Sequence, residues 1–270
     1  MKKKNRQQVV MEMPIQTPNN INPVSSSLDS SPIIPQRSKI KNELHIKERP
    51  DLTEKQKEFV ELALNKNTKL IFVEGPAGTS KSYTTAYISL LLMNQRKISD
   101  IVYVRSAVES SDKSIGYLPG NLVDKLAVYT DIIWDKLEEL LPKNEIAILK
   151  KEERITGLGL GFLRGKTFSS RVVILDEAQN SNFKEILTFI SRAGEYSKLF
   201  VIGDKLQSDL KIGNRGGFEK MIDCFDDAES RDNGIFTFRF GTEDIVRSKL
   251  VRFIIERVEK MNSSKEPIHC

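Results

Sequence analysis

Cysteine and histidine are scarce in this chain. Of its 270 residues only two are cysteine, Cys224 and Cys270, and only two are histidine, His45 and His269. Two cysteines this far apart supply neither a disulfide framework nor the Cys-x-x-Cys pairs of a zinc site. Two histidines are too few for a histidine-ligated zinc or a histidine-based catalytic triad. The composition therefore excludes these classes of site.

Long hydrophobic runs are also missing. No apolar stretch approaches the roughly 18 residues that predict a membrane-spanning helix. The basic start, MKKKNR, is not followed by the apolar core of about 7–15 residues that a secretory signal needs. We therefore expect a cytoplasmic protein with no membrane partner.

Basic residues are in excess only near the start of the chain. Residues 1–50 hold nine Lys or Arg and four Asp or Glu, which accounts for the whole formal net charge of +5. They also contain six of the ten prolines and no Phe, Trp, Tyr or Gly. Such a segment cannot bury enough apolar surface to offset its ordering entropy, so we predict a disordered, basic, Pro/Ser-rich tail. The neutral body, 51–270, lacks the simplest electrostatic signature of nucleic-acid binding.

Short apolar strands alternate with helical segments through the body. The pattern predicts strands at 69–74, 100–105, 171–179, 198–204 and 235–240. It also predicts helices between them, with 121–141 and the final 242–260 among these, and a loop or bend at the glycine-rich 157–162. This alternation is typical of a parallel sheet covered on both faces. We therefore expect one α/β domain whose ligand lies at the carboxyl ends of the strands.

A loop of small residues joins the first predicted strand to a helix. Small residues let successive backbone N–H groups wrap a phosphate at the helix N-terminus. Lys81 would reach the β- and γ-phosphates of ATP, and the Ser82 hydroxyl would bind Mg²⁺. Such loops usually have glycine before the lysine, and Ser80 is expected to fit if it is already helical. The predicted phosphate-binding residues are Gly75, Pro76, Ala77, Gly78, Thr79, Ser80, Lys81 and Ser82.

Two adjacent acids end a later apolar strand. Four apolar residues, 172–175, precede Asp176 and Glu177. Packing does not explain them, because burying an unpaired carboxylate costs several kcal/mol. A nucleotide-hydrolysing site needs a carboxylate for Mg²⁺ and a second one for the attacking water. We assign Asp176 to the metal and Glu177 to the water.

Two glutamines each allow two interpretations. Gln207 follows the next strand in Gly-Asp-x-x-Gln, where it would detect the γ-phosphate or simply belong to a turn. Gln56 stands three residues after Thr53. It would read an adenine edge through its amide, or complete a Thr-x-x-Gln capping box at the start of a helix.

Together these stretches resemble the PhoH family of ATPases, which is related to the first motor domain of superfamily 1 helicases. The matching segments cover most of 51–257 and read LTEKQKEFV, VEGPAGTSKS, YVRSAVES, IGYLPG, LRGKTF, VVILDEAQN, VIGDKLQSDL and DIVRSKLVRFII. The resemblance implies a RecA-like P-loop NTPase fold with a central parallel sheet flanked by helices. It further implies binding of ATP with Mg²⁺, and a link to RNA or single-stranded DNA.

The chain has room for only one RecA-like domain, whereas superfamily 1 enzymes take an arginine finger from a second. Such a finger is worth about 10³–10⁵ in rate. We therefore expect a homo-oligomer, such as a six-membered ring, in which a neighbour supplies the arginine in trans. Arg247, on the final predicted helix, is the leading candidate, although it could instead pair with Glu243 or Asp244. The other candidates are Arg105, Arg164 and Arg239.

Three other activities remain open at this stage. A P-loop small-molecule kinase is disfavoured by Glu177, since a water-activating acid would promote wasteful hydrolysis. A nucleotide-gated switch with slow turnover is compatible with Ser80 and with the neutral body. A motor that unwinds duplexes is the third, and polymer-stimulated ATP hydrolysis would separate it from the switch.

Overall fold

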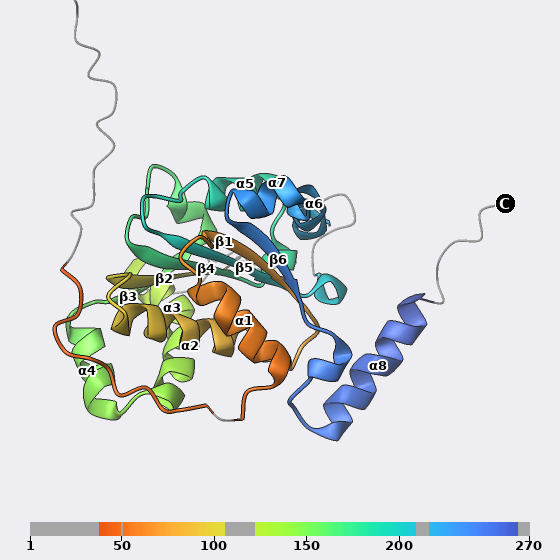
Figure 1. The fold of residues 1–270 in the computed structure, drawn as a ribbon, viewed down its shortest axis with the longest axis horizontal. Helices are drawn as coiled ribbons and strands as arrows, with labels where there is room; N and C mark the ends of the chain where they lie inside the picture. Colours follow the sequence, from red (N-terminus) through yellow and green to blue (C-terminus); the bar gives the residue numbers. More distant parts are fainter. Residues whose placement is uncertain (1–37, 50, 106–121, 209–215, 264–270) are drawn as a thin grey trace, which may run out of the picture. The chain divides into compact units, whose positions relative to one another are not determined.

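The computed structural model of the chain describes residues 38–49, 51–105, 122–208 and 216–263. These residues form a six-stranded sheet in which every neighbouring pair of strands is parallel (Figure 1). The strand order is β3-β2-β4-β5-β1-β6. The strands are β1 (Leu70–Glu74), β2 (Asp100–Arg105), β3 (Ile155–Gly159), β4 (Arg171–Asp176), β5 (Lys198–Gly203) and β6 (Ile235–Arg239). The predicted parallel α/β architecture is confirmed.

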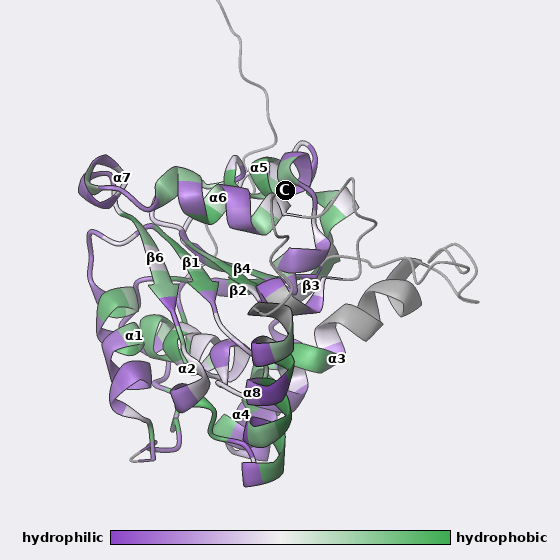
Figure 2. Cartoon of the chain, turned by 90° about the vertical axis from the view of Figure 1, so that its right-hand side faces the viewer, coloured by the Kyte–Doolittle hydropathy of each residue, from purple (hydrophilic) through white to green (hydrophobic). Residues whose placement is uncertain are grey.

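Helices cover both faces of this sheet. One face packs against α1 (Glu54–Leu64), α2 (Lys81–Asn94), α3 (Leu122–Leu140) and α4 (Lys143–Lys151). The other packs against α5 (Phe183–Ile190) and α6 (Gly217–Phe225), and α7 (Ala228–Asp232) precedes β6. Each face has its own apolar core, and the apolar strands run between them (Figure 2). Burial on both faces explains why the strands read as continuous apolar runs.

One strand, β3, lies in a stretch whose glycine-rich part was predicted to be a loop or bend. It occupies the sheet edge beside β2, and Thr156 is exposed. Within this strand, position 157 is a glycine because Thr130 on α3 passes too close to leave room for a Cβ atom. Gly157 thus reflects close helix–strand packing, a requirement that a strand pattern does not reveal, whereas a Cβ on Gly161 would meet nothing within 4 Å.

The folded body begins earlier than the sequence predicted. Residues 38–49, assigned to the disordered tail, pack along α2 and α4, with Ile40 and Leu44 buried. The backbone of Leu44 exchanges two hydrogen bonds with the Asn94 side chain, at 2.9 and 2.8 Å. The Ser38 carbonyl accepts from Arg154 at 2.6 Å. Partners far along the chain order this segment, and its own composition does not show them. The remainder of the predicted tail, 1–37, lies outside the described residues.

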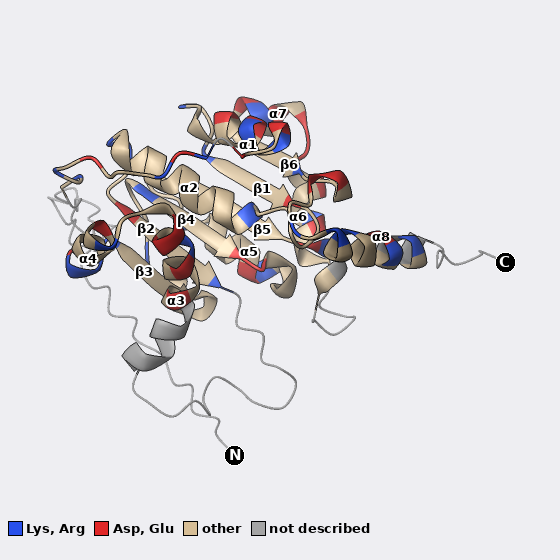
Figure 3. Cartoon of the chain, turned by 90° about the horizontal axis from the view of Figure 1, so that it is seen from below, with Lys and Arg blue, Asp and Glu red and all other residues tan. Residues whose placement is uncertain are grey.

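The final predicted helix is shorter than expected. A 3₁₀ turn, Thr242–Asp244, is followed by an irregular stretch, and α8 spans Lys249–Ser263. Val251 N donates to Ser248 Oγ at 3.4 Å, as expected where serine begins a helix. Basic residues lie along α8 (Figure 3), and five large apolar side chains on it are exposed: Leu250, Phe253, Ile254, Val258 and Met261. No helix in the described ranges combines the length and apolar character needed to cross a bilayer.

Candidate functional site

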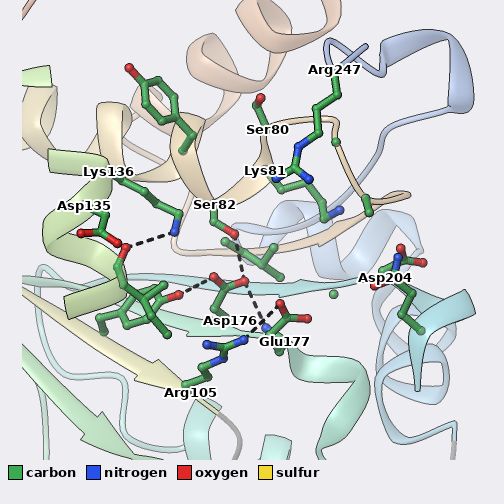
Figure 4. A pocket seen from close by; sticks show the side chains of 18 of the residues that line it. Ser80, Lys81, Ser82, Arg105, Asp135, Lys136, Asp176, Glu177, Asp204 and Arg247 are labelled. Atoms are coloured by element: carbon green, nitrogen blue, oxygen red, sulfur yellow. Dashed lines mark hydrogen bonds and ion pairs between the residues drawn. The ribbon is translucent and has the colours of Figure 1, made fainter. Parts of the chain in front are cut away.

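The carboxyl ends of β2, β4 and β5 and the loop after β1 surround a cavity of about 720 Å³, here named the carboxyl-edge cavity (Figure 4). It lies where a parallel α/β sheet is expected to bind its ligand. Nine of the thirteen residues that the sequence assigned to the nucleotide site line it: Ala77, Gly78, Ser80, Lys81, Ser82, Asp176, Glu177, Gln207 and Arg247. The other four, Gln56, Gly75, Pro76 and Thr79, do not line it and support the loop.

Two glycines let the loop after β1 pass close to the rest of the chain. A Cβ atom on Gly75 would lie 2.7 Å from the Cβ of Phe240. Gly78 has a φ of +90°, a conformation in which side chains are strained. Its carbonyl accepts a hydrogen bond from Val246 N at 3.1 Å. The loop is therefore fastened on one side by the segment that precedes α8.

Ser80 is not helical, contrary to the condition on which its tolerance was predicted. Its φ of 60° and ψ of 26° place it in the left-handed region, and its side chain makes no capping hydrogen bond. This conformation explains why glycine is usual at this position, because glycine adopts it without steric cost. Ser80 therefore stores backbone strain beside Lys81.

The Lys81 ammonium is held by the loop itself. Its Nζ donates to the carbonyl oxygens of Gly75 at 2.6 Å and Pro76 at 2.9 Å. Burial lowers the pKa of Lys81, and the carboxylates of Asp204, Asp176, Glu177 and Glu74 act in the opposite direction. The lysine thus lies close to several acids, although none forms an ion pair with it among the residues that the structure describes.

Gln56, on α1, holds the phosphate-binding loop through a hydrogen bond to its backbone. Its Nε2 donates to the Thr79 carbonyl at 3.2 Å, and its Oε1 accepts from Thr53 N at 3.1 Å. The Thr53 hydroxyl accepts from Gln56 N, which completes the capping box of α1. Gln56 is only 2% exposed. One amide proton and one oxygen lone pair stay available, but the side chain is buried and does not line the carboxyl-edge cavity, so it does not present an adenine-reading edge there.

Asp176 connects the loop to the acid-bearing strand. The Ser82 hydroxyl donates to Asp176 Oδ1 at 3.0 Å, between residues 94 positions apart. Tyr103 Oη donates to the other carboxylate oxygen, Oδ2. Burial raises the pKa of Tyr103, and the charge of Asp176 raises it further, so the phenol stays protonated as a donor. Tyr103 is 1% exposed, which excludes it as a stacking platform for bases.

Glu177 is oriented by two side chains. It follows β4 in the left-handed conformation, with a φ of 57°. Its Oε2 accepts from Gln179 Nε2 at 2.7 Å, and its Oε1 lies 3.5 Å from Arg105 Nη2. A non-glycine residue in this region turns the chain sharply, so Asp176 and Glu177 both face the cavity although neighbours in a strand point to opposite faces.

Gln179 was missed by the residue assignments, although it lies within the quoted DEAQN segment. Its Nε2 also approaches the Gln207 carbonyl at 3.4 Å, and its Oε1 accepts from Asp204 N at 3.0 Å. A single amide therefore links Glu177 with the turn after β5. The signal available in the sequence was an amide side chain two positions after Glu177. The structure shows that this amide is buried, at 4% exposed.

Arg247 lies at the loop of its own chain. It belongs to the irregular segment before α8, because the helix begins only after Ser248. Methylene carbons of Arg247 lie 3.4 Å from the position of a Cβ built on Gly78. Within the described residues Arg247 forms no ion pair with Glu243 or Asp244, and the Asp244 carboxylate accepts from Gly241 N at 2.7 Å.

The other candidate fingers have different surroundings. Arg105 lines the carboxyl-edge cavity and approaches Glu177. Arg239 is paired with Glu74 at 3.2 Å and Asp226 at 2.7 Å. Arg164 is exposed and lies outside the cavity lining. None of the three supplies an unpaired guanidinium to the cavity.

One end of the cavity is formed by residues that the sequence did not single out. The Arg49 guanidinium stacks on the Tyr83 ring, 4.5 Å from its centroid, and both line the cavity. Asp135, Lys136 and Glu139 on α3 line the same part. A planar, partly exposed aromatic–guanidinium pair is suited to stacking against a base. Because it depends on residues 34 positions apart along the chain, no local motif predicts it.

The donor set fits a magnesium ion that is held mainly by a nucleotide. Ser82 and Asp176 supply hard oxygen atoms 3.0 Å apart. Within the described residues no cluster of three or more His, Cys, Asp or Glu side chains could enclose a metal ion on its own. Magnesium is usually bound by one or two protein oxygens together with substrate phosphates and water. The site therefore suits Mg²⁺ bound with a triphosphate.

Comparisons with known proteins match most of this chain to one family. The model of the family described as PhoH-like protein matches residues 49–259. A PhoH-like protein of Bacillus subtilis (strain 168) is 34% identical over 210 residues, covering 77% of this chain and 63% of that protein. Protein PhoH of Escherichia coli (strain K12) is 30% identical over 203 residues, covering 74% and 56%. The chain thus spans between half and two thirds of the length of these relatives.

Solved structures with a partly similar fold include helicases. Pif1 helicase from Candida albicans matches with a TM-score of 0.35 and 15% identity, over 81% of this chain and 49% of that one. Bacteroides sp Pif1 in complex with ADP-AlF4 matches with a TM-score of 0.31 and 15% identity, over 75% and 44%. The sheet topology and the loop geometry, not these low scores, carry the fold assignment.

Proposed function

Because the chain belongs to the PhoH-like protein family, we propose that it binds ATP with Mg²⁺ in the carboxyl-edge cavity and hydrolyses it. We further propose that RNA or single-stranded DNA controls the rate. A single observation carries the first proposal: the Ser82 hydroxyl contacts the Asp176 carboxylate at 3.0 Å. A phosphate-binding loop and an acidic strand end meet there.

Each residue has a role that follows from its position. Backbone N–H groups of the lining residues between 77 and 82 would surround the β-phosphate, and Lys81 would exchange its carbonyl partners for phosphate oxygens. Mg²⁺, held by Ser82 and the charge of Asp176, would offset the negative charge of the phosphates. Glu177, oriented by Arg105 and Gln179, would accept a proton from the attacking water. Gln207 would detect the γ-phosphate at the rim.

Control by a polymer fits the way two of these groups are held. Lys81 is bound to loop carbonyls, and Glu177 is held by two side chains. Glu177 already has its orienting contacts, but Lys81 must leave the loop carbonyls before it can bind phosphate, so a low basal rate is expected. The same observation favours the second candidate, a nucleotide-gated switch with slow turnover. The two differ in whether a single strand accelerates hydrolysis.

The test is phosphate release from Mg-ATP, measured alone, with RNA and with single-stranded DNA. Lys81→Ala should lose nucleotide binding, whereas Glu177→Gln should retain binding and lose at least 100-fold in turnover, an order-of-magnitude estimate of about 2.7 kcal/mol. Lys220→Ala and Glu61→Gln, on exposed parts of α6 and α1, are the matched controls. No binding of Mg-ATP by the unmodified chain would falsify the proposal. Equal turnover with and without either polymer would support the switch.

We also propose a homo-oligomer. Its support is α8, on which five large apolar side chains at helical spacing are exposed. A second copy of the chain is the proposed cover for this stripe. Because Arg247 lies at the loop of its own chain, we revise its role to a donor in cis. The expected supply of an arginine in trans is kept as the alternative that mixing Arg247 and Lys81 variants tests.

A further inference from the structure

A second cavity opens at the amino-terminal ends of the strands, opposite the carboxyl-edge cavity. Its volume is about 1170 Å³, and we name it the amino-edge cavity. It is bounded by the first residues of β1, β5 and β6 and by the turns that lead into β2 and β4. The carboxyl-edge cavity lies at the other ends of these strands, so the two cavities share no lining residue.

Apolar side chains form the floor of the amino-edge cavity. Leu92, Ile190, Phe225 and Ile235 contribute to it from both faces of the sheet. Tyr196 lies at the rim, where it is 76% exposed and has a φ of 58°. Ligand pockets in proteins are mostly apolar concave sites of roughly 300–1,000 Å³ with a few polar groups. This cavity is of that kind and slightly larger.

The charged lining of this cavity is almost entirely of one sign. Glu195 is its one acidic residue. Against it stand six cations: Lys39, Lys66, Lys69, Arg96, Lys97 and Lys198. In the part of the chain that the structure describes, none of the six forms an ion pair with a carboxylate. Lys198 is buried and the other five are exposed, so the group gives the apolar cavity a positive rim that favours an anionic ligand.

Part of this cluster has a structural explanation. Lys198 Nζ donates to the carbonyls of Ala63 and Asn65, and Lys97 Nζ donates to that of Leu64 at 3.2 Å. These carbonyls end α1, where cations are favourable. Burial, and then the charge of Lys97, lowers the pKa of Lys198 to about 8, so the position disfavours a second positive charge.

The capping of α1 does not account for Lys39, Lys66 and Lys69. No hydrogen bond or ion pair of the side chains of Lys39, Lys66 and Lys69 is found among the described ranges. They come from two segments, the stretch before α1 and the connection 65–69 between α1 and β1. Their convergence on an apolar floor is a feature that neither a solvated helix face nor a capping role requires.

We propose that the amino-edge cavity binds an organic anion with an apolar body, in which an acidic head group meets the lysines and a hydrocarbon or aromatic part contacts the floor. A neutral ligand leaves Lys39, Lys66 and Lys69 without an anionic partner, and a small inorganic anion leaves the apolar floor exposed to water. The basic sequence of residues 1–37 disfavours that segment as the occupant, because it would add positive charge. The ligand chemistry, a carboxylate or phosphate ester, is shared by acyl and phosphoryl metabolites.

The probe for this proposal is 1-anilinonaphthalene-8-sulfonate, whose fluorescence rises in apolar sites. With the full chain we expect saturable binding of one probe per chain. Lys69→Glu with Lys97→Glu should weaken it at least about tenfold. A second pair, Lys66→Glu with Lys69→Glu, should act in the same direction. Lys151→Glu, on α4 and outside the lining, should leave it unchanged. Thermal unfolding of each variant checks that it folds.

Competition defines the site and the head group. Lys81→Ala should bind the probe as the unmodified chain does, and Mg-ATP should not displace it, since nucleotide is assigned to the other cavity. Decanoate and decyl phosphate distinguish a carboxylate from a phosphate ester, and displacement by either supports the proposal. It is overturned if neither displaces the probe, if ATP does, or if uncharged 1-anilinonaphthalene binds as tightly and ignores the charge reversals.

Discussion

Arg105 and Glu177 approach to 3.5 Å at the ends of two adjacent parallel strands, β2 and β4. Arg105 pairs in register with Asp176, the residue immediately before Glu177. A displacement of the end of β2 would therefore change the position of Glu177, the acid assigned to the attacking water.

Arg105→Gln should slow hydrolysis without weakening nucleotide binding. The loss of one of two groups that orient Glu177 should lower kcat about tenfold, or about 1.4 kcal/mol, with KM within about twofold. Arg105→Lys, which keeps the charge, should recover part of the rate. Arg164→Gln is the control, because Arg164 is exposed and outside the cavity. A rise in KM with unchanged kcat would contradict a positioning role.

Ser80→Gly should stabilise the chain. Glycine removes the left-handed strain at a φ of 60°, and we expect the free energy of unfolding to rise by about 1 kcal/mol. Ser191→Gly is the matched control, since Ser191 ends α5 in a right-handed conformation and glycine there should not stabilise. Chemical denaturation measures both. A Ser80→Gly variant less stable than the unmodified chain would show that the serine side chain is needed.

Phosphate release by Ser80→Gly and Ser191→Gly shows whether the backbone strain at Ser80 also affects the rate of ATP hydrolysis. If the Ser80 conformation limits turnover, phosphate release should be at least as fast in Ser80→Gly as in the unmodified chain.

Arg247→Ala should lose at least tenfold in kcat, because its guanidinium is assigned to the nucleotide of the same chain. The decisive experiment mixes Arg247→Ala with Lys81→Ala chains after joint refolding. A donor in cis predicts no recovery of activity, whereas a donor in trans predicts recovery at sites that pair an intact loop with a neighbour's arginine. Nucleotide binding by Arg247→Ala alone confirms that its loop is intact.

Phe253→Asp with Ile254→Asp should reduce the mass of the particle in solution to that of a monomer. Both side chains are about half exposed on α8, at 56% and 50%, and charge there would prevent burial against another copy. Ile148→Asp is the matched control, because Ile148 is 47% exposed on α4. Light scattering after size-exclusion chromatography gives the masses. An unmodified chain that is already monomeric at high concentration would remove the proposed oligomer.

Lys198→Met should change how stability depends on pH. The pKa of Lys198 is lowered to about 8 in the folded chain, against about 10.4 for an unperturbed lysine. Between these values the unfolded chain binds more protons, so the free energy of unfolding rises with pH. Lys198→Met removes this contribution, and its stability relative to the unmodified chain should fall from pH 7 to pH 10. Lys151→Met should show no such trend.

Most of the residues that line the candidate site were predicted from the sequence, because their signals are local. Residues 75–82 form a contiguous motif, and Asp176 and Glu177 interrupt an apolar run, so both are visible without a structure. The sheet follows from alternating apolar strands for the same reason. What was missed depends on contacts between distant segments. Gln179, β3 and the pair of Arg49 with Tyr83 acquire their roles only from neighbours that the fold supplies.

Two corrections have the same cause. The Ser80 conformation is fixed by the way the loop closes over Lys81, and propensity alone does not give the sign of φ. Arg247 was assigned to a helix because 242–260 has helical periodicity, whereas Ser248 begins the helix and the preceding residues fasten the loop at Gly78. Tertiary contacts override the local pattern at both places.

The stretch before α1 has a practical consequence for trimmed versions of the protein. A fragment starting at Asp51 would keep every motif of the site, yet it would strip Asn94 of both backbone partners and uncover the apolar surface beneath Ile40 and Leu44. It would also deprive Arg154 of its bond to Ser38. Expression boundaries for crystallisation or labelling therefore belong upstream of Ser38, not at the first recognisable motif.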